Sequence, residues 1–464
     1  MVIYNVQVLQ VQRLKTQDIF VIGLMTFALF LGAGNLIFPP AMGLNAGTSL
    51  SSAMGGFLLT AVGLPTFTII VLGRIGHIRN LTKALPNWLG ATFWILLFTA
   101  IGPAFGMPRA VTVAYEMGIK PFLESDHLLL FSILFSAITL LLAFKPGNIV
   151  TYIGKIITPA LILLLCGLGF SAFIHPLGLP TAPYGDYQHS AVTNGLIQGY
   201  MTMDAIAAVG FGWVIIQAIK AKGITSQQGI ASSSMKIAGI YAVLMSACYI
   251  VMGYVGATSA TIAEHGMNGS VILTRYVAEA FGPYGQYLLA AIIIMACLTT
   301  TVGLTNACAE YYQETFKAPF SFTAAIIVVL TGVIANFGLD EILKVSLPAI
   351  LVLCPIALAL TLASFTASIL TVSRLTHSGM LITATLFGVL DAVNILGEMP
   401  LELNALFVRS LPLYNAHASW LLPSLLILIT TVIIGRTSTA EKIFGCVDYR
   451  LNTQSNSANY EYDR

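Results

Sequence analysis

Two short polar motifs lie inside apolar stretches of the chain. The first comprises Gly32, Ala33, Gly34 and Asn35 and is followed by the pair Pro39-Pro40. The second comprises Tyr200, Met201, Thr202 and Asp204 and is flanked by Gly199, Gly210 and Gly212. Glycine and proline interrupt helices and so expose backbone N–H and C=O groups. N–H groups that open a half-helix attract a carboxylate, and carbonyls that close one attract an ammonium group or a small cation.

A third motif is rich in hydroxyl groups. Thr299, Thr300 and Thr301 are consecutive and follow an apolar stretch that includes Ala296. Threonines in an apolar helix usually donate to a carbonyl of the preceding turn, and that explanation remains open here. Consecutive hydroxyls beside the carbonyls of an interrupted helix would instead form an oxygen shell for a cation of the size of sodium.

Two charged residues accompany these motifs. Asp204 follows the second motif, and an acid at the depth of a bilayer is costly enough to suggest a function. The alternative is a neutral or paired acid that caps the interruption. Arg109, in the segment Gly102–Arg109, either closes an outer vestibule by pairing with an acid or extends to the membrane surface.

The elements that carry these motifs belong in a membrane. Hydrophobic residues make up 57% of the 464 residues and charged residues 9%, against roughly 25% charged in soluble domains. Apolar stretches of about 20 residues recur, which suits a hydrocarbon core about 30 Å thick. The pattern predicts an all-α membrane protein with twelve transmembrane helices, at 18–44, 49–73, 88–118, 127–144, 146–173, 193–218, 230–255, 283–310, 320–338, 342–368, 378–397 and 416–435.

The two interruptions fall in the first and the sixth of these spans. An offset of five helices reverses the direction of the second interrupted span, which predicts an inverted repeat formed by 18–173 and 193–368. Residues 378–435 then supply two additional helices. Sixteen of the 21 Lys and Arg residues lie on one side if the spans alternate, the exceptions being Arg109, Lys120, Arg275, Lys344 and Arg409. This bias predicts that the amino terminus (1–17) and the tail (436–464) are both cytoplasmic, and the first span is expected to remain uncleaved.

Several classes of function lack their motifs. The sequence has no Lys/Arg run for nucleic acid, no GxxxxGK[ST] loop for ATP, and neither HExxH nor GxSxG, so we expect no enzyme. The six cysteines form no CxxC pair and are expected to be buried apolar residues. A zwitterionic amino acid bound beside a cation suits two interrupted helices. Other small substrates, and the membrane subunit of an ATP-driven importer, remain alternatives.

Four segments together resemble the bacterial branched-chain amino acid:cation symporter family. They are LFLGAGNLIFPPAMG, GPAFGMPRAV, QGYMTMDAIAAVGFG and ACLTTTVGLTNACAEYY. The resemblance extends over essentially the whole chain. It implies a five-plus-five inverted repeat with two extra helices, as in the amino acid–polyamine–organocation group. It also implies uptake of leucine, isoleucine and valine, together with Na⁺ or a proton, across the bacterial cytoplasmic membrane. Neither an ATPase subunit nor a cofactor is expected.

The resemblance further implies the positions of the sites. The backbone around Gly32, Ala33, Gly34 and Asn35 would bind the substrate carboxylate, and carbonyls near Tyr200, Met201 and Thr202 would bind its ammonium group. The cation would bind carbonyls of Ala28, Leu31 and Ala296 and hydroxyls of Thr299 and Thr300, with Thr301 as an alternative. We expect an apolar wall for the substrate side chain from Leu36, Ile37, Phe38, Met201, Met203 and Ile206.

Overall fold

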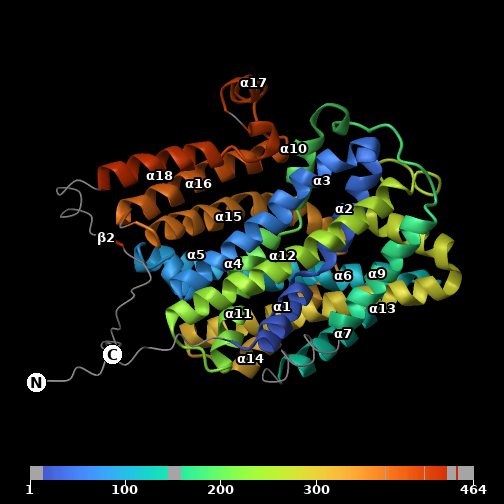
Figure 1. The fold of residues 1–464 in the computed structure, drawn as a ribbon, viewed down its shortest axis with the longest axis horizontal. Helices are drawn as coiled ribbons and strands as arrows, with labels where there is room; N and C mark the ends of the chain where they lie inside the picture. The colour runs from blue at the N-terminus through green and yellow to red at the C-terminus, as the bar shows by residue number, and fades with distance from the viewer. Residues whose placement is uncertain (1–13, 145–157, 371, 412, 436–445, 448–464) are drawn as a thin grey trace, which may run out of the picture.

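The computed structural model describes residues 14–144, 158–370, 372–411, 413–435 and 446–447. This part of the chain is almost entirely helical, as the sequence predicts (Figure 1). The strands within it are β1 (Val372–Ser373) and β2 (Cys446–Val447), which pair antiparallel with Val372 opposite Val447.

Helices account for the rest of the regular structure. In the first part of the chain they are α1 (Thr16–Phe30), α2 (Ala33–Ala46), α3 (Leu50–Leu58), α4 (Leu64–Ile75), α5 (Asn87–Thr99), α6 (Gly106–Gly118), α7 (Leu128–Ala143) and α9 (Thr158–Ile174). In the second part they are α10 (Tyr187–Tyr200), α11 (Asp204–Ala221), α12 (Gln227–Ala257), α13 (Gly269–Phe316), α14 (Phe320–Ala335), α15 (Leu339–Ala367), α16 (Arg374–Ile395), α17 (Leu401–Ser410) and α18 (Leu421–Gly435).

The described helices have the length and composition of a multi-span membrane protein. Seven helical stretches among the described residues are long and apolar enough to cross a bilayer, and five shorter apolar helices accompany them. The all-helical, multi-span character is therefore confirmed, and the number of twelve spans stays a prediction. Residues 145–157, which include the start of the expected fifth span, lie outside the described part.

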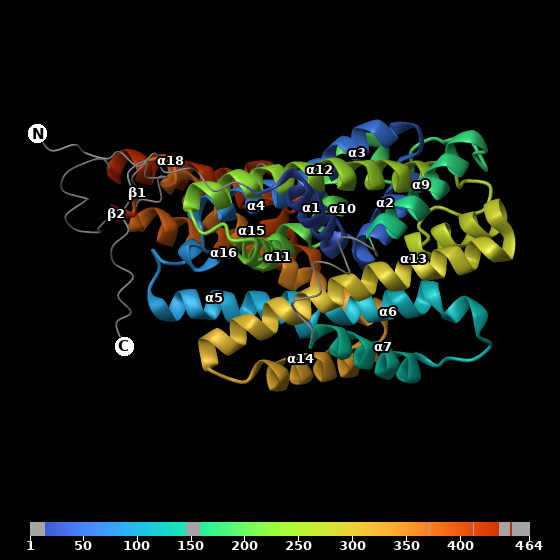
Figure 2. The ribbon, with the colours of Figure 1, turned by 60° about the horizontal axis from the view of Figure 1, so that its bottom comes forward.

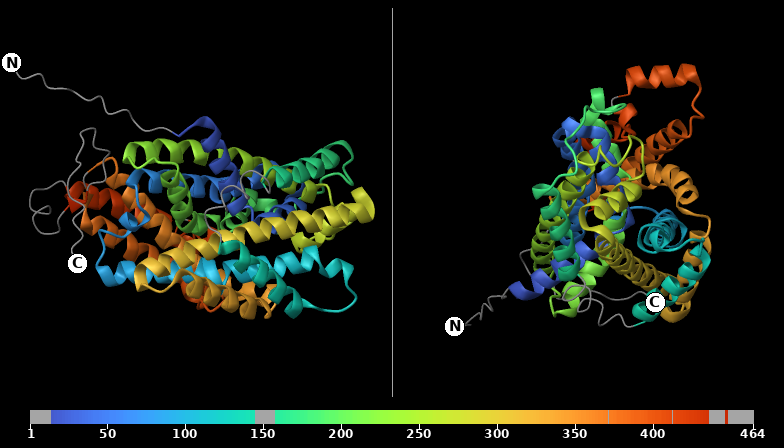
Figure 3. Two further views of the ribbon diagram at one scale, coloured as in Figure 1. Left: turned by 90° about the horizontal axis from the view of Figure 1, so that it is seen from below. Right: turned by 90° about the vertical axis from the view of Figure 1, so that its right-hand side faces the viewer.

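Two expected connections contain helix. Helix α13 begins at Gly269, well before the expected start of the eighth span at 283, because Asn268 caps it by accepting a hydrogen bond from the Ser270 N–H. Gly282, inside α13, has φ +62°, a left-handed conformation that glycine adopts without strain and that precedes Pro283. The expected connection 398–415 contains α17, which has no buried residues and stands off the other helices (Figure 3).

The helices pack in a way that brings distant parts of the sequence together. Helices α15, α16 and α18 lie side by side at one edge (Figure 1), and α12 packs against α1, α2 and α4. The long helix α13 runs along α6 and also contacts α2 and α14 (Figure 2). Elements α1, α2, α11, α12 and α13 therefore meet in the middle of the molecule.

Aromatic side chains fill the core where these elements meet. The Phe30 ring, at the end of α1, lies 5.0 Å from the Phe211 ring of α11 and 4.6 Å from the Tyr241 ring of α12, measured between centroids. All three side chains are buried. Aromatic pairs at these distances contribute about 0.5–1.5 kcal/mol beyond their buried area. This packing fixes the end of α1 beside α11, and the functional site starts there.

Candidate functional site

The first predicted interruption is confirmed. Helix α1 ends at Phe30 and α2 begins at Ala33, and the intervening Gly32 is extended with φ −109° and ψ −166°. No side chain in the part of the chain that the structure describes caps the N-terminus of α2. The N–H groups of its first turn therefore lack intrahelical acceptors, and the helix dipole adds about half a positive charge there.

The second predicted interruption is confirmed as well. Helix α10 ends at Tyr200 and α11 begins at Asp204, and Met203 between them is left-handed with φ 69°. The Thr202 hydroxyl donates to the Gly199 carbonyl at 2.8 Å and accepts from the Asp204 N–H at 3.3 Å. A left-handed residue other than glycine costs about 1–2 kcal/mol, and such costs concentrate at functional sites.

The expected third span is also interrupted, which the sequence analysis did not predict. A π-helical turn covers Ala100–Ala104, and Gly102 inside it is non-helical with φ −87° and ψ −116°. Helix α6 then starts anew at Gly106. The change of direction carries the first turn of α6 toward the two other interruptions.

A cavity of about 50 Å³ lies where the three interruptions meet. Its polar lining includes Gly32, Gly34, Asn35, Thr202, Asp204, Thr300 and Arg109. Its apolar lining includes Phe30, Ile101, Met203, Phe211 and Leu304. A water molecule needs about 10–15 Å³ of such space, so the cavity has room for a few waters. Side chains must move before it can admit a larger molecule.

Asp204 is held by two neutral partners. Its Oδ2 accepts from Asn35 Nδ2 at 2.8 Å and from the Tyr249 hydroxyl at 2.5 Å, and Asn35 Nδ2 also contacts that hydroxyl. The Asp204 side chain is only 3% exposed. Tyr249, from α12, was missed by the sequence analysis, although a tyrosine within an apolar span is a signal for a buried hydroxyl that needs a partner.

Arg109 lines the cavity, so the second of its two alternatives, extension to the membrane surface, is wrong. The residue is 4% exposed, and its Nη1 and Nη2 donate to the carbonyls of Met201 at 3.2 Å and Thr202 at 3.4 Å. The guanidinium carbon lies 5.3 Å from the centre of the Phe38 ring. Gly34 leaves room for the guanidinium, because a Cβ there would overlap Nη2. Among the described residues no ion pair joins Arg109 to an acid, which leaves the expected gate of that kind without support.

The predicted cation ligands are brought together in part. The Thr299 hydroxyl lies 3.0 Å from the Ala28 carbonyl and 2.9 Å from the Ala296 carbonyl, so three predicted oxygens form one cluster between α1 and α13. The Thr300 hydroxyl bonds to the Leu29 carbonyl at 2.9 Å and lines the cavity. Leu31 is buried between α1 and α2.

Thr301 faces away from this cluster. Its hydroxyl donates to the Leu298 carbonyl at 3.0 Å and lies 3.4 Å from the Thr139 hydroxyl of α7. The structure thus distinguishes Thr299 and Thr300 from Thr301, which the sequence left open. Among the described residues no group of three or more His, Cys, Asp or Glu could hold a metal ion, so hydroxyl and carbonyl oxygens are the candidate ligands.

Some predicted residues lie elsewhere. Tyr200 and Met201 are not among the residues that line the cavity, and Met201 takes part through its carbonyl, which Arg109 occupies. Nothing is described for the side chain of Ala33. Of the residues expected to form the apolar wall only Met203 lines the cavity. The register of α2 and α11 turns Leu36, Ile37, Phe38 and Ile206 aside, and Met201, in the interruption between α10 and α11, takes part through its carbonyl alone.

A second buried acid, Asp391 of α16, was not anticipated. Its Oδ1 accepts from the Ser419 hydroxyl at 2.8 Å and its Oδ2 from the Ser419 N–H at 3.2 Å. Asp391 is fully buried, and Ser419 lies just before α18. These hydrogen bonds connect α16 to the turn before α18. They explain why Asp391 is buried and give it a structural role, separate from the cavity.

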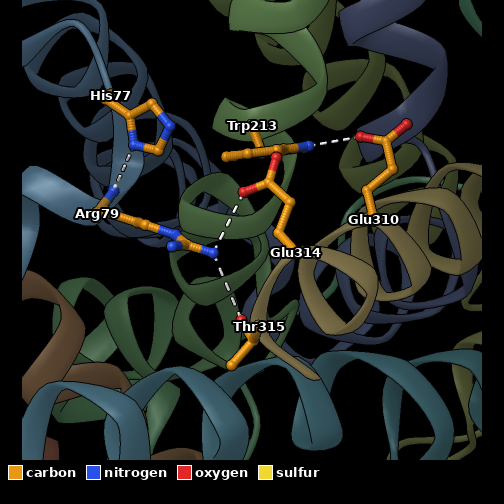
Figure 4. A network of polar contacts seen from close by, with 6 residues as sticks. All are labelled: His77, Arg79, Trp213, Glu310, Glu314 and Thr315. Carbon is orange, nitrogen blue, oxygen red and sulfur yellow. Dashed lines mark hydrogen bonds and ion pairs between the residues drawn. The ribbon is translucent and has the colours of Figure 1, made fainter. Parts of the chain in front are cut away.

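A polar network joins three elements at one end of the bundle (Figure 4). Arg79, in the turn after α4, forms an ion pair with Glu314 of α13 at 3.2 Å and contacts the Thr315 hydroxyl at 3.5 Å. Trp213 of α11 donates from Nε1 to Glu310 of α13 at 2.5 Å. The network therefore links the connection after α4, the end of α13 and the second half of the sixth expected span.

His77 lies against this network. Its ring makes an edge contact with the Trp213 ring, with centroids 5.3 Å apart, and its Nδ1 accepts from the Arg79 N–H at 3.1 Å. Burial, with the nearby charges of Lys220 and Arg79, lowers the pKa of His77 to about 4. The imidazole is therefore neutral at neutral pH. At the same end Lys222, after α11, pairs with Asp18 of α1 at 2.8 Å.

Comparison with known proteins identifies the family to which this chain belongs. The family model for branched-chain amino acid transport proteins matches residues 15–438. The branched-chain amino acid permease BrnQ of Haemophilus influenzae is 37% identical over 427 residues, which cover 90% of this chain and 98% of the permease. The branched-chain amino acid transport system 2 carrier protein of Pseudomonas aeruginosa is 38% identical over 91% of this chain and 97% of that protein.

Solved structures show the same architecture at low sequence identity. Mhp1, a nucleobase-cation-symport-1 family transporter in a closed conformation with bromovinylhydantoin bound, has a TM-score of 0.58 at 14% identity and covers 92% of this chain and 93% of its own. MhsT in complex with L-phenylalanine has a TM-score of 0.54 at 14% identity and covers 91% and 100%. The helices therefore adopt a fold that resembles the LeuT-fold transporters.

Proposed function

As a member of the branched-chain amino acid transport protein family, the chain is a cation-coupled secondary carrier of branched-chain amino acids, and we propose that it imports them by alternating access around the cavity between α2 and α11. The observation that carries this proposal is the meeting of two interrupted helices at one cavity. The first interruption presents the uncapped N-terminus of α2, and the second presents the backbone carbonyls at the C-terminal end of α10. Opposite backbone charges at a shared cavity suit a zwitterion.

The substrate contacts follow from these backbone groups. The N–H groups around Gly32, Ala33, Gly34 and Asn35 bind the α-carboxylate, and the carbonyls near Tyr200, Met201 and Thr202 bind the α-ammonium group. Asp204 adds a carboxylate on the ammonium side, held in position by Asn35 and Tyr249. The side chain of the substrate packs against Phe30, Ile101, Phe211 and Leu304.

The coupling cation, Na⁺ or a proton, moves with the substrate. For Na⁺, the cluster of the Thr299 hydroxyl with the Ala28 and Ala296 carbonyls supplies oxygen ligands, and Leu31 and Thr300 complete the predicted set. The membrane potential contributes about 2.3 kcal/mol per charge per 100 mV.

Twelve membrane-spanning helices, with a five-plus-five inverted repeat and both termini cytoplasmic, complete the proposal. In that orientation the network around Arg79 and Glu314, which includes their ion pair, lies at the cytoplasmic end, and we propose that it closes that end. Release of substrate to the cytoplasm then requires these contacts to separate. The surrounding membrane is the bacterial cytoplasmic membrane.

Selectivity comes from apolar burial. Leucine has three more carbons than alanine, each worth about 0.8 kcal/mol when buried, or about 2.4 kcal/mol together, which is on the order of fifty-fold in affinity. Leucine, isoleucine and valine differ by one carbon or by branching and should compete for one site. Alanine should compete weakly, and lysine and glutamate should not compete.

Reconstitution of the purified chain alone tests the proposal. Proteoliposomes with an imposed sodium or proton gradient and no ATP should accumulate labelled leucine, and isoleucine and valine should inhibit that uptake. Uptake that requires a separate ATPase would identify the membrane subunit of an ATP-driven importer. Strong inhibition by lysine or glutamate, or none by isoleucine and valine, would indicate a carrier of another substrate.

A further inference from the structure

Arg109 occupies the carbonyls that the proposed function assigns to the substrate ammonium group. Its Nη1 and Nη2 donate to the carbonyls of Met201 and Thr202, the last residues before the left-handed turn at Met203. A guanidinium and an ammonium group both donate hydrogen bonds and carry one positive charge. In this structure the arginine therefore fills the position that a substrate cation would take.

The same guanidinium lies against the other interrupted helix. A Cβ on Gly34 would overlap Nη2, so the guanidinium lies directly beside the first turn of α2. The N-terminus of α2 has no side-chain cap and attracts anions. A carboxylate bound at that N-terminus would lie next to the five N–H donors of Arg109, a geometry that suits bidentate contact.

The cavity is thus lined by one basic and one acidic side chain that make no direct ion pair. Arg109 and Asp204 both line it, and the described residues contain no ion pair between them. Each is held by uncharged partners, Arg109 by carbonyls and Asp204 by Asn35 and Tyr249. Both charges remain able to take an ionic partner.

We propose that Arg109 is a direct ligand of the substrate α-carboxylate and that it releases the Met201 and Thr202 carbonyls when substrate binds. The incoming carboxylate draws the guanidinium toward α2, and the ammonium group then takes the two carbonyls and faces Asp204. This movement also enlarges a cavity that has room for only a few waters in this structure. The inference rests on the proposed function and adds a requirement for a free carboxylate.

The test compares leucine with leucinamide, which keeps the ammonium group and side chain but lacks the carboxylate. Binding of both ligands is measured by calorimetry to the purified full-length protein in saturating sodium chloride and again at acidic pH. The wild-type protein should bind leucine about 10- to 100-fold more tightly than leucinamide, because that is the usual contribution of hydrogen bonds to a charged group to binding affinity. Arg109→Gln should reduce this preference through weaker leucine binding, with the remainder due to the N–H groups of α2, and leucinamide binding should stay within a few-fold.

Two further variants control the comparison. Arg275→Gln removes an arginine that also donates to a carbonyl, that of Ile262 at 3.0 Å, but lies outside the cavity lining. It should keep the wild-type preference. Arg109→Lys keeps the charge without the planar fork and should show an intermediate preference.

The outcomes separate this inference from the proposed function. Equal binding of leucine and leucinamide by the wild-type protein would overturn the carboxylate contact of Arg109 together with the one assigned to α2, and would leave leucine as the substrate; this outcome requires no variant to fold. Equal loss of both ligands in Arg109→Gln would show a merely structural arginine. If the wild-type protein bound another amino acid but not leucine, the proposed substrate would be wrong, and the comparison with the corresponding amide would still test Arg109. Binding of no amino acid would overturn both.

Discussion

Replacing Thr299 by valine tests the cation site most directly. Valine has nearly the shape of threonine but no hydroxyl, and Thr299 is 2% exposed, so packing is preserved while one oxygen is lost. That oxygen lies 3.0 Å from the Ala28 carbonyl and 2.9 Å from the Ala296 carbonyl. An interaction with a charged group contributes about 1.5–3 kcal/mol, so the affinity for the cation should fall by about 10- to 100-fold.

The assay follows leucine binding as the sodium concentration is varied. Because coupling between two ligands is reciprocal, weaker cation binding should appear as a higher sodium concentration for half-maximal leucine binding. Leucine affinity at saturating sodium should stay close to the wild-type value, since the substrate contacts are unchanged. The same titration against pH detects a proton as the coupling ion.

Thr301→Val is the matched control. It makes the same change two residues further along α13, where the hydroxyl faces Leu298 and Thr139. Its sodium dependence should match that of the wild-type protein. Wild-type sodium dependence in Thr299→Val, or an equal loss in both variants, would refute the assignment of this cluster.

Three further predictions concern the cavity and the network at the end of α13. Gly34→Val should abolish leucine binding while the protein still inserts, because a Cβ there overlaps the Arg109 guanidinium; Gly239→Val, where a Cβ meets no atom within 4 Å, should bind leucine normally in the same assay. Asp204→Asn should weaken leucine binding at least tenfold by removing the charge opposite the ammonium group, whereas Asp391→Asn should lower the melting temperature and leave leucine binding unchanged. His77 has its pKa lowered to about 4, so its contribution to the network around Arg79 and Glu314 should be present above pH 6.5 and be lost as the pH falls toward 4; the protection factors of amides at the end of α13 should fall over that range in the wild-type protein and stay flat in His77→Gln.

The interruptions could be predicted from the sequence because local residue chemistry determines them. Gly32 lies at the interruption before α2, and the motif that ends at Asp204 lies at the interruption before α11, whereas Pro39 and Pro40 are accommodated inside α2. The interruption at Gly102 escaped notice because a single Gly-Pro step within an apolar span is also typical of a continuous, bent helix.

The direction of side chains could not be predicted from the sequence. Successive residues of an α-helix point about 100° apart, so the three consecutive threonines face different neighbours, and the rotation of α13 decides which of them meets α1. Thr299 and Thr300 meet carbonyls of α1, and Thr301 meets α7. The position of Arg109 likewise depends on the change of direction at Gly102, which turns a side chain expected near the membrane surface into the cavity.

The energetics of burial explain why a carrier keeps Arg109 and Asp204 apart. Removing an ion from water costs several kcal/mol even after the protein relaxes, and a direct ion pair recovers part of that cost. In this cavity the pair is not made, and the two charges are instead held by backbone carbonyls and by Asn35 and Tyr249. Neutral dipoles stabilise a buried charge less than an opposite charge does, so both groups still gain from ionic partners. A zwitterion supplies both ionic partners at once, whereas a ligand with a single charge leaves either Arg109 or Asp204 with its neutral partners alone. The unpaired charges therefore favour ligands that carry a carboxylate and an ammonium group together, and the apolar lining decides among those ligands by their side chains.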